Sequence, residues 1–188
     1  MNDLRTVDFV HMADGTREDY AIIREHVRRM DEHLVAHVIS LLEGLKGETL
    51  GYKVDRYTHS LQSATLALRD GADEELVVCA LLHDVGDNIA PHNHSQMAAA
   101  LLRPYVSDEN HWVVAHHGLF QGYYYYHHYD RDRNARDAFR DHPHYDACVR
   151  FCERYDQCAF DPDYDTLELG AFEPMLRRVL TVPKQGYD

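Results

Sequence analysis

The segment from Cys79 to His94 combines an apolar run with side chains that can bind metal ions. It holds the adjacent pair His83 and Asp84, and His92 and His94 follow close behind. Imidazole and carboxylate groups are costly to bury without partners, and a metal ion offsets that cost because it accepts their lone pairs. A carboxylate that binds one ion through each oxygen suits a two-metal site, in which the ions lie about 3.5–4 Å apart. The segment therefore predicts a centre in which Asp84 bridges two metal ions and His83 binds one of them.

Apolar spacing and capping residues predict the helices that position these side chains. The third helix begins at Asp73, an N-cap residue, and ends at Gly86. Apolar residues lie on nearly all of its sides, which is typical of a buried helix, so His83 and Asp84 are expected at the inner end of a central helix. The predicted helices are 16–47, 55–70, 73–86, 94–103, 107–117, 144–158 and 167–180.

The first predicted helix is long and amphipathic. Thr16 and Asp19 resemble a capping box at its start, and its apolar residues recur every three or four positions: Ile23, Val27, Met30, Leu34, Val38, Leu41 and Leu45. The stretch GLFQGYYYYHHYD contains two glycines and is expected to be irregular or a broken helix. Strand-like alternation, internal repeats and linkers are absent from the sequence, which predicts an all-α single domain.

Composition narrows the classes of partner. The 188 residues carry a formal net charge of -13, which argues against a surface for nucleic acids or anionic membranes, because such surfaces need clustered Lys and Arg. The sequence has no apolar run of about 18 residues and no basic-then-apolar N-terminus, so no membrane span or signal peptide is expected. Its four cysteines form no CxxC pair and are interpreted as thiols of a reducing cytosol. We therefore expect a cytoplasmic protein.

The pattern of metal-binding residue types resembles that of the HD-domain superfamily of all-α metalloproteins. The resemblance rests on His59 in one predicted helix, the His83-Asp84 pair in LLHDVGD, and the distant Asp156. Many members of that superfamily are phosphohydrolases, and two additional histidines between the pair and the last Asp mark its two-metal subset. The resemblance implies an HD-domain helical bundle over residues 1–188, in which an N-terminal helix segment, 1–50, packs on a metal-binding core, 51–180.

Longer stretches resemble one branch of the superfamily. HSLQSATLALRDGADEELVVCALLHDVGD, NHSQMAAALLRPYV and VVAHHG are similar to diiron oxygenases that cleave hydroxylated aminoalkylphosphonates, and HHGLFQGYYYY and FCERYDQCAFDPDYDTLELGAFEPML are similar to myo-inositol oxygenase. The resemblance covers residues 50–180. It implies an Fe(II)/Fe(III) pair, with Mn, Co or Zn as alternative metals. The implied ligands are His59, His83, Asp84 and Asp156 for one ion, and Asp84, His94 and His117 for the other.

Two ligand positions have alternatives in the sequence. His92 could take the place of His94, although His94 stands at the matching helix start in NHSQMAAALLR. His116 could take the place of His117. Adjacent helical residues point in different directions, so only one of His116 and His117 is expected to bind.

At the positions expected to contact the substrate, this sequence has other residue types than the oxygenases that it resembles. Gln121 stands where the phosphonate oxygenases have a Lys that grips the phosphonate, and Tyr52 stands where they have a gating Glu. Asp87 replaces a Lys of myo-inositol oxygenase and could hold a neighbouring His or a cationic group. Arg56, three residues before His59, could face the site. Tyr124 is the candidate chosen from the tyrosine-rich stretch 123–128. That stretch is interpreted either as lining of the substrate pocket or as aromatic packing between helices.

The resemblance implies an oxygenase that uses O2 on a small hydroxylated substrate, organophosphonate or polyol-like, with cleavage of a C–P or C–C bond. An alternative is a dinuclear-metal phosphohydrolase that acts on a nucleotide or another phosphoester, and a third is a catalytically silent HD module that binds a ligand. The sequence leaves open whether the chain forms oligomers. The first helix is expected either to cover the pocket or to pair with a second chain.

Overall fold

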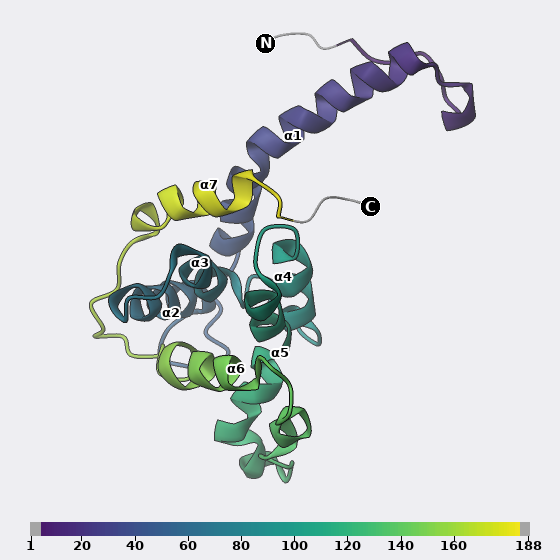
Figure 1. Ribbon diagram of the computed structural model, residues 1–188. Coiled ribbons are helices and arrows are strands. Elements are labelled where there is room, and N and C mark those ends of the chain that lie inside the picture. The colour runs from purple at the N-terminus through teal and green to yellow at the C-terminus, as the bar shows by residue number, and fades with distance from the viewer. Residues whose placement is uncertain (1–4, 185–188) are drawn as a thin grey trace.

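Helices form the regular structure of residues 5–184, the part of the chain that the computed structural model describes, and that part contains no strand. The prediction of an all-α fold is therefore confirmed. The α-helices are α1 (Arg17–Glu43), α2 (Arg56–Arg69), α3 (Glu74–Leu82), α4 (His94–Leu102), α5 (Asp108–Tyr125), α6 (Tyr145–Phe151) and α7 (Glu173–Thr181), arranged as shown in Figure 1. A π-helical turn, η4 (Cys152–Asp156), follows α6 directly.

The third helix lies at the centre of the core, as its apolar sequence predicts. Residues from Val77 to Leu82 are completely buried, and α3 contacts α2, α5 and α7. Burial of aliphatic side chains on all sides stabilises this arrangement by about 1.5–3 kcal/mol for each large side chain. The residues that follow the last turn of α3, His83 and Asp84, therefore also lie in the interior of the molecule.

Capping residues begin the helices around this core, and those at Thr16, Asp73 and Ser107 were predicted. Thr16 and Asp19 form a capping box at the start of α1. Asp55, Asp73 and Ser107 each accept a backbone N–H through the side chain at the starts of α2, α3 and α5. These caps satisfy amide groups that would otherwise lack intrahelical partners, and they fix where each helix begins.

The fifth helix differs from its prediction, because it continues through the two glycines to Tyr125 instead of ending at His117. Both glycines allow a close approach. A Cβ at Gly118 would lie 2.8 Å from Ser95 Oγ, and one at Gly122 would lie 2.4 Å from the Tyr126 ring. Close packing therefore explains why glycine occupies these two positions, which the sequence analysis interpreted as breaks in the helix.

Several helix ends also differ from the predictions. The first helix ends at Glu43 and is followed by turns as far as Gly47, and the third ends at Leu82, four residues before Gly86. The segment predicted as one helix over 144–158 consists of α6 and the π-helical turn η4. That turn places Asp156 at its last position.

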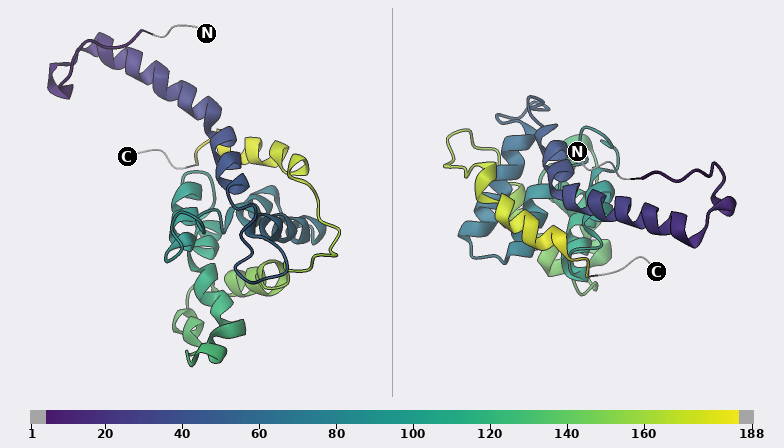
Figure 2. Two further views of the ribbon diagram at one scale, coloured as in Figure 1. Left: turned by 180° about the vertical axis from the view of Figure 1, so that it is seen from behind. Right: turned by 90° about the horizontal axis from the view of Figure 1, so that it is seen from above.

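The two halves of α1 lie in different surroundings. Val35, Val38 and Leu42 are buried against the body of the molecule, whereas Val27 and Met30 are 50% and 65% exposed. Figures 1 and 2 show the N-terminal half projecting away from the other helices. We call residues 17–34 the free half of α1. No helix within residues 5–184 has both the length and the apolar character needed to span a membrane.

Candidate metal centre

Five segments supply the six residues predicted as metal ligands, and the structure brings all six together. His59 comes from α2, His94 is the first residue of α4, and His117 comes from α5. His83 is the C-cap of α3 and Asp84 follows it, while Asp156 ends the π-helical turn. π-Helical turns often occur at functional sites, because the extra residue re-aims a side chain. All six are buried except His94, whose side chain is 26% exposed.

The carboxylate of Asp84 lies between two groups of imidazoles. Its Oδ2 atom is 3.3 Å from Nε2 of His59 and 3.2 Å from Nε2 of His83. Its Oδ1 atom is 3.1 Å from Nε2 of His117 and 3.4 Å from Nε2 of His94. Each oxygen therefore faces a different pair of histidines, which is the arrangement that a bridging carboxylate requires.

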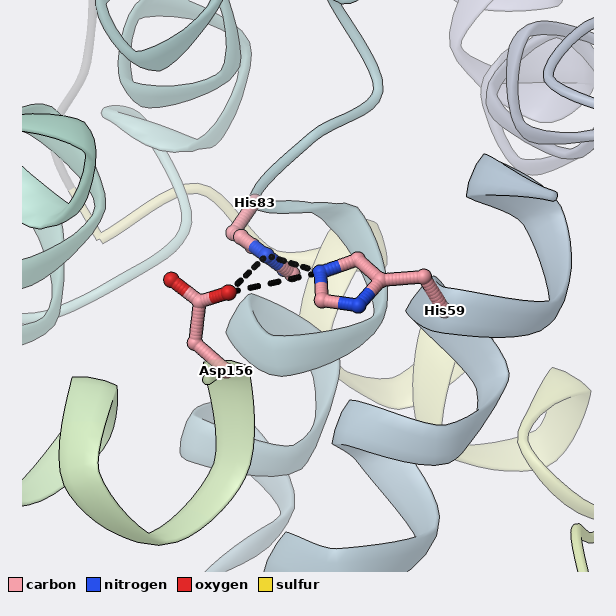
Figure 3. Close-up of side chains that lie close together, drawn as sticks. All are labelled: His59, His83 and Asp156. Carbon is pink, nitrogen blue, oxygen red and sulfur yellow. Dashed lines mark hydrogen bonds and ion pairs between the residues drawn. The ribbon is translucent and has the colours of Figure 1, made fainter. Parts of the chain in front are cut away.

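Asp156 completes the first group, shown in Figure 3. Its Oδ1 atom lies 3.3 Å from Nε2 of His59 and 3.6 Å from Nε2 of His83, and the two Nε2 atoms are 3.2 Å apart. We call this group, with Asp84 Oδ2, the first half-site. His94, His117 and Asp84 Oδ1 form the second half-site. Each half-site contains two imidazoles and at least one carboxylate.

Backbone carbonyls orient three of the imidazoles. Nδ1 of His59 donates to the carbonyl of Ala159 at 3.0 Å, and Nδ1 of His83 donates to that of Ala80 at 2.8 Å. Nδ1 of His117 donates to the carbonyl of Val114 at 2.7 Å. A carbonyl oxygen only accepts, so Nδ1 carries the hydrogen in each ring and Nε2 presents a lone pair to the centre. This second contact of each ring is typical of metal-binding histidines.

The electrostatics of the centre favour a bound cation. Burial lowers the pKa of all four histidines, and it lowers that of His83 to about 4, so the rings are neutral near pH 7. Burial by itself would raise the pKa of Asp156, but its contacts with His59 and His83 outweigh burial and hold the pKa of this carboxyl well below its usual range. Neutral lone pairs and carboxylates at these distances repel one another unless a cation lies between them.

An unpaired atom supports the same conclusion. Asp156 Oδ2 is buried and has no hydrogen-bond partner among the described residues. A buried carboxylate oxygen without a donor is costly, and a metal ion would satisfy it. The residues present therefore fit a metal, and the combination of nitrogen and oxygen donors suits iron, manganese, cobalt or zinc.

Arg56 is buried beside the centre and already has two carboxylate partners. Its guanidinium pairs with Asp84 Oδ2, and its Nε donates to Asp87 Oδ2 at 2.6 Å. The other oxygen of Asp87 lies 3.3 Å from Nδ1 of His94. Asp87 therefore joins Arg56 to the second half-site, in agreement with its predicted contact to a neighbouring histidine. Asp84, Asp87 and His94 also lie close enough to hold an ion.

Gln121 lies against the first half-site. Its Nε2 atom donates to Asp156 Oδ1 at 2.8 Å, while its Oε1 atom is buried and has no partner among the described residues. Gln121 follows His117 by one helical turn, so both face the centre from α5. Tyr125 follows after one more turn on the same face.

The aromatic residues near the centre occupy two separate places. Tyr52 is 50% exposed and stacks on Phe160, which in turn stacks on His59, with ring centroids 4.3 and 4.4 Å apart. Burial raises the pKa of Tyr125, and the nearby oxygens of Tyr126, Tyr52 and Asp156 raise it further. Tyr52 therefore lies outside the first half-site, separated from His59 by Phe160, and the phenol of Tyr125 is within electrostatic range of Tyr52 and Asp156.

Tyr124, the tyrosine selected from the sequence, has different neighbours from Tyr125. Burial raises the pKa of its hydroxyl, which lies near Cys152 and Arg136. The adjacent phenol of Tyr125 is the one near Asp156. Sequence reasoning included Tyr125 only as part of the stretch 123–128 and missed Phe160, although the four-residue spacing of His117, Gln121 and Tyr125 is a signal that could have singled out Tyr125.

The alternative ligands lie away from the centre. His92 is exposed on the turn before α4. His116 stacks on Trp112 at 4.1 Å between ring centroids, and its Nδ1 contacts the Trp112 carbonyl. The structure therefore brings His94 and His117 into the centre and leaves their neighbours outside it.

Comparison with known proteins agrees with this geometry. No curated protein matches the chain at a significant level. The family model described as HD domain matches residues 56–157, which is more than half of the chain and includes all six candidate ligands. The described residues form a helical bundle of the predicted type, they contain clusters of His and Asp able to hold metal ions, and the family model matches the same part of the chain. This chain therefore belongs to the HD-domain family of metal-dependent enzymes.

Proposed function

We propose that the protein is a dinuclear non-haem iron oxygenase that acts with O2 on a small hydroxylated substrate. The observation that supports this most is the composition of the two half-sites. Each combines two imidazoles with a carboxylate, a ligand set typical of non-haem iron oxygenases, and Asp84 belongs to both. When bound, the ions supply Lewis acidity and the redox chemistry with O2, and the protein supplies positioning and charge.

An unpaired acceptor beside the ligands favours a substrate that carries hydroxyl groups. Gln121 Oε1 is buried without a donor among residues 5–184. A hydroxyl group can donate to such an atom, whereas an ionised phosphate offers acceptors only. Gln121 is therefore proposed to hold a substrate hydroxyl while it positions Asp156. Tyr52 and Tyr125 are proposed to contact the part of the substrate that lies further from the ions.

The charge of Arg56 argues against phosphoester hydrolysis as the main activity. Phosphoryl transfer requires cations on the oxygens of the transferred group. Arg56 is buried and neutralises Asp84 and Asp87, so it has little freedom to reach a phosphate. Its proposed role is to balance the charge of these two carboxylates and to hold Asp87 against His94.

Oxygen uptake and phosphate release distinguish the oxygenase from a hydrolase. Iron-loaded protein should consume O2 when polyols or hydroxylated phosphonates are added, and partial oxidation should give the EPR signal of a coupled Fe(II)/Fe(III) pair. The opposite result is phosphate release from nucleotides under anaerobic conditions with Mn or Co. That result, without substrate-dependent O2 uptake, would replace the oxygenase proposal with the hydrolase.

Two adjacent tyrosines provide a matched test of the substrate contacts. Tyr125→Phe should raise KM by about five- to tenfold, the effect of losing one hydrogen bond, with iron content unchanged. Tyr124→Phe should leave KM unchanged, because its hydroxyl lies with Arg136. If Tyr124→Phe alone raises KM, Tyr124 contacts the substrate and Tyr125 does not.

A further inference from the structure

The free half of α1 carries an apolar stripe that no part of residues 5–184 covers completely. Val27 and Met30 are largely exposed, and Ile23 and Leu34 are partly buried. The four residues are separated by four, three and four positions, which is the spacing of a two-stranded coiled coil. An isolated helix of this length is marginal in water, so an amphipathic segment that projects from the body needs a packing partner.

A groove lies where the free half meets the body. It has a volume of about 620 Å³ and runs between α1 and the end of α7. Leu34, Val35 and Leu180 supply part of its apolar lining, and Asp31 lies on its wall. The groove continues the exposed stripe and is wide enough to receive side chains from a second helix.

Two unpaired charges flank the stripe. Arg24 and Asp31 are exposed, lie seven residues apart, and therefore project from nearly the same side of the helix. Within residues 5–184 neither has an ion-pair partner, whereas Glu25 pairs with Arg28 and Arg29 on the same helix. One positive and one negative charge on a single flank can pair with the same flank of an identical helix that runs in the opposite direction.

We propose that the free half of α1 pairs with that of a second copy of this chain in an antiparallel coiled coil. Val27 of each copy lies against Met30 of the other, and Ile23 lies against Leu34 at the mouth of the groove. In this register Arg24 of each copy faces Asp31 of the other, so that two equivalent ion pairs flank the apolar contact. Shifting the register by one heptad toward the N-terminus places the two Arg24 side chains opposite each other, and like charges disfavour it.

The position of the body favours the antiparallel direction. Val35, Val38 and Leu42 are buried against the body on a face of α1 that adjoins the stripe. A parallel partner would bring its own body to the same end of the helix pair as the first body. An antiparallel partner places its body at the far end, where, of the described residues, only the segment 5–16 lies beside the helix, as Figure 2 shows. The two metal centres would then be independent.

Sedimentation of the full-length protein tests the pairing. The wild-type chain should sediment at twice its monomer mass at micromolar concentration. Arg24→Asp and Asp31→Arg each replace the two attractive contacts by repulsive ones, and each should raise the dissociation constant by about tenfold or more. Both positions are exposed, so the variants should fold and bind metal as the wild type does. A monomeric wild-type chain would overturn the proposal.

Mixing the two variants tests the register directly. Arg24→Asp has acids at positions 24 and 31, and Asp31→Arg has arginines at both. The mixture should therefore form a heterodimer, although neither variant dimerises well alone. Arg29→Asp makes the same charge change away from the stripe and should leave the wild-type dimer intact. Failure of the mixture to dimerise, or equal loss of dimer in Arg29→Asp, would exclude this antiparallel contact.

Discussion

Asp84 contacts both half-sites, because its two oxygens face different pairs of imidazoles. The neighbouring residue His83 contacts Asp84 Oδ2 and Asp156 in the first half-site, and its ring also lies 4.8 Å from that of His117, measured between centroids. His83 therefore lies between the two half-sites, on the side of the first. His116 and His117 form a second adjacent pair, of which only His117 faces Asp84.

Substitutions at these positions should remove different numbers of ions. Asp84→Ala should reduce bound metal from about two ions per chain to nearly none, because both half-sites lose a ligand. His117→Gln should remove mainly the ion of the second half-site. Elemental analysis of purified protein measures both effects.

His116→Gln is the matched control, since its ring stacks on Trp112 outside the centre. It should keep the full metal content. Retention of both ions in Asp84→Ala would contradict the shared role of this carboxylate.

At the scale of elements, Gly86 controls how closely the turn after α3 approaches the start of α4. A Cβ at this position would lie 3.0 Å from both Cα and the carbonyl oxygen of His94, and 2.9 Å from Sδ of Met97. The nearest atoms include backbone, which cannot move without shifting the helix. The absence of a side chain at Gly86 therefore lets His94 reach Asp84.

Gly86→Ala should displace α4 and impair the second half-site more than the first. We expect a loss of about 1–3 kcal/mol in the free energy of unfolding, the usual cost of overpacking, together with loss of roughly one ion. Urea denaturation and elemental analysis measure the two effects. Gly170→Ala is the control, because a Cβ there meets no atom within 4 Å. Equal affinity at both half-sites in Gly86→Ala would argue against this role.

Glu75 connects α3 to the start of α5. Its Oε1 atom accepts hydrogen bonds from the Ser107 backbone N–H at 2.6 Å and from Asn110 Nδ2 at 2.7 Å, and its Oε2 atom pairs with Lys184. Burial by itself would raise the pKa of Glu75, but these donors outweigh it and lower the pKa to about 2. The carboxylate form is therefore the one that the fold stabilises.

The contribution of Glu75 to stability should depend on pH. The unfolded chain has the ordinary value of 4.5 at this carboxyl, so the contribution is complete above that pH and is lost as the pH falls toward about 2. Glu75→Gln should cost about 1–2 kcal/mol near pH 7, after allowance for solvent screening. The difference between the wild type and Glu75→Gln in urea denaturation should shrink as acid is added. A difference that stays constant with pH would show that the carboxylate charge contributes nothing.

At the scale of the whole molecule, the metal centre joins segments that are distant in the sequence. Its ligands come from α2, the end of α3, α4, α5 and η4. Bound ions would therefore link most of the core and offset the repulsion among the buried lone pairs. α1 and α7 supply no candidate ligand, and they cover the outside of this core.

Removal of metal by a chelator should destabilise the whole molecule. At a free metal concentration of one hundred times the dissociation constant, binding contributes about 2.7 kcal/mol per site, so the melting temperature should fall by several degrees on chelation. Differential scanning calorimetry measures the shift. Asp84→Ala should melt at the same temperature with and without chelator, and an unchanged melting temperature in the wild type would indicate that the centre binds no ion.

The sequence by itself determined the helical class, the buried third helix and most helix starts. These depend on local features, such as apolar spacing and the caps at Asp55, Asp73 and Ser107, that act within one or two turns. The His83-Asp84 pair was also visible in the sequence, and the other candidate ligands followed from the resemblance to the HD-domain superfamily that this pair and its flanking residues indicate.

Only the tertiary structure decided which neighbours face the centre. Tyr125 rather than Tyr124 lies near Asp156, Phe160 stacks between Tyr52 and His59, and Asp87 connects Arg56 to His94. The continuation of α5 through Gly118 and Gly122 was likewise decided by packing against Ser95 and Tyr126. Such contacts depend on the angle and separation of helices that are far apart in the chain, and local propensity does not specify these.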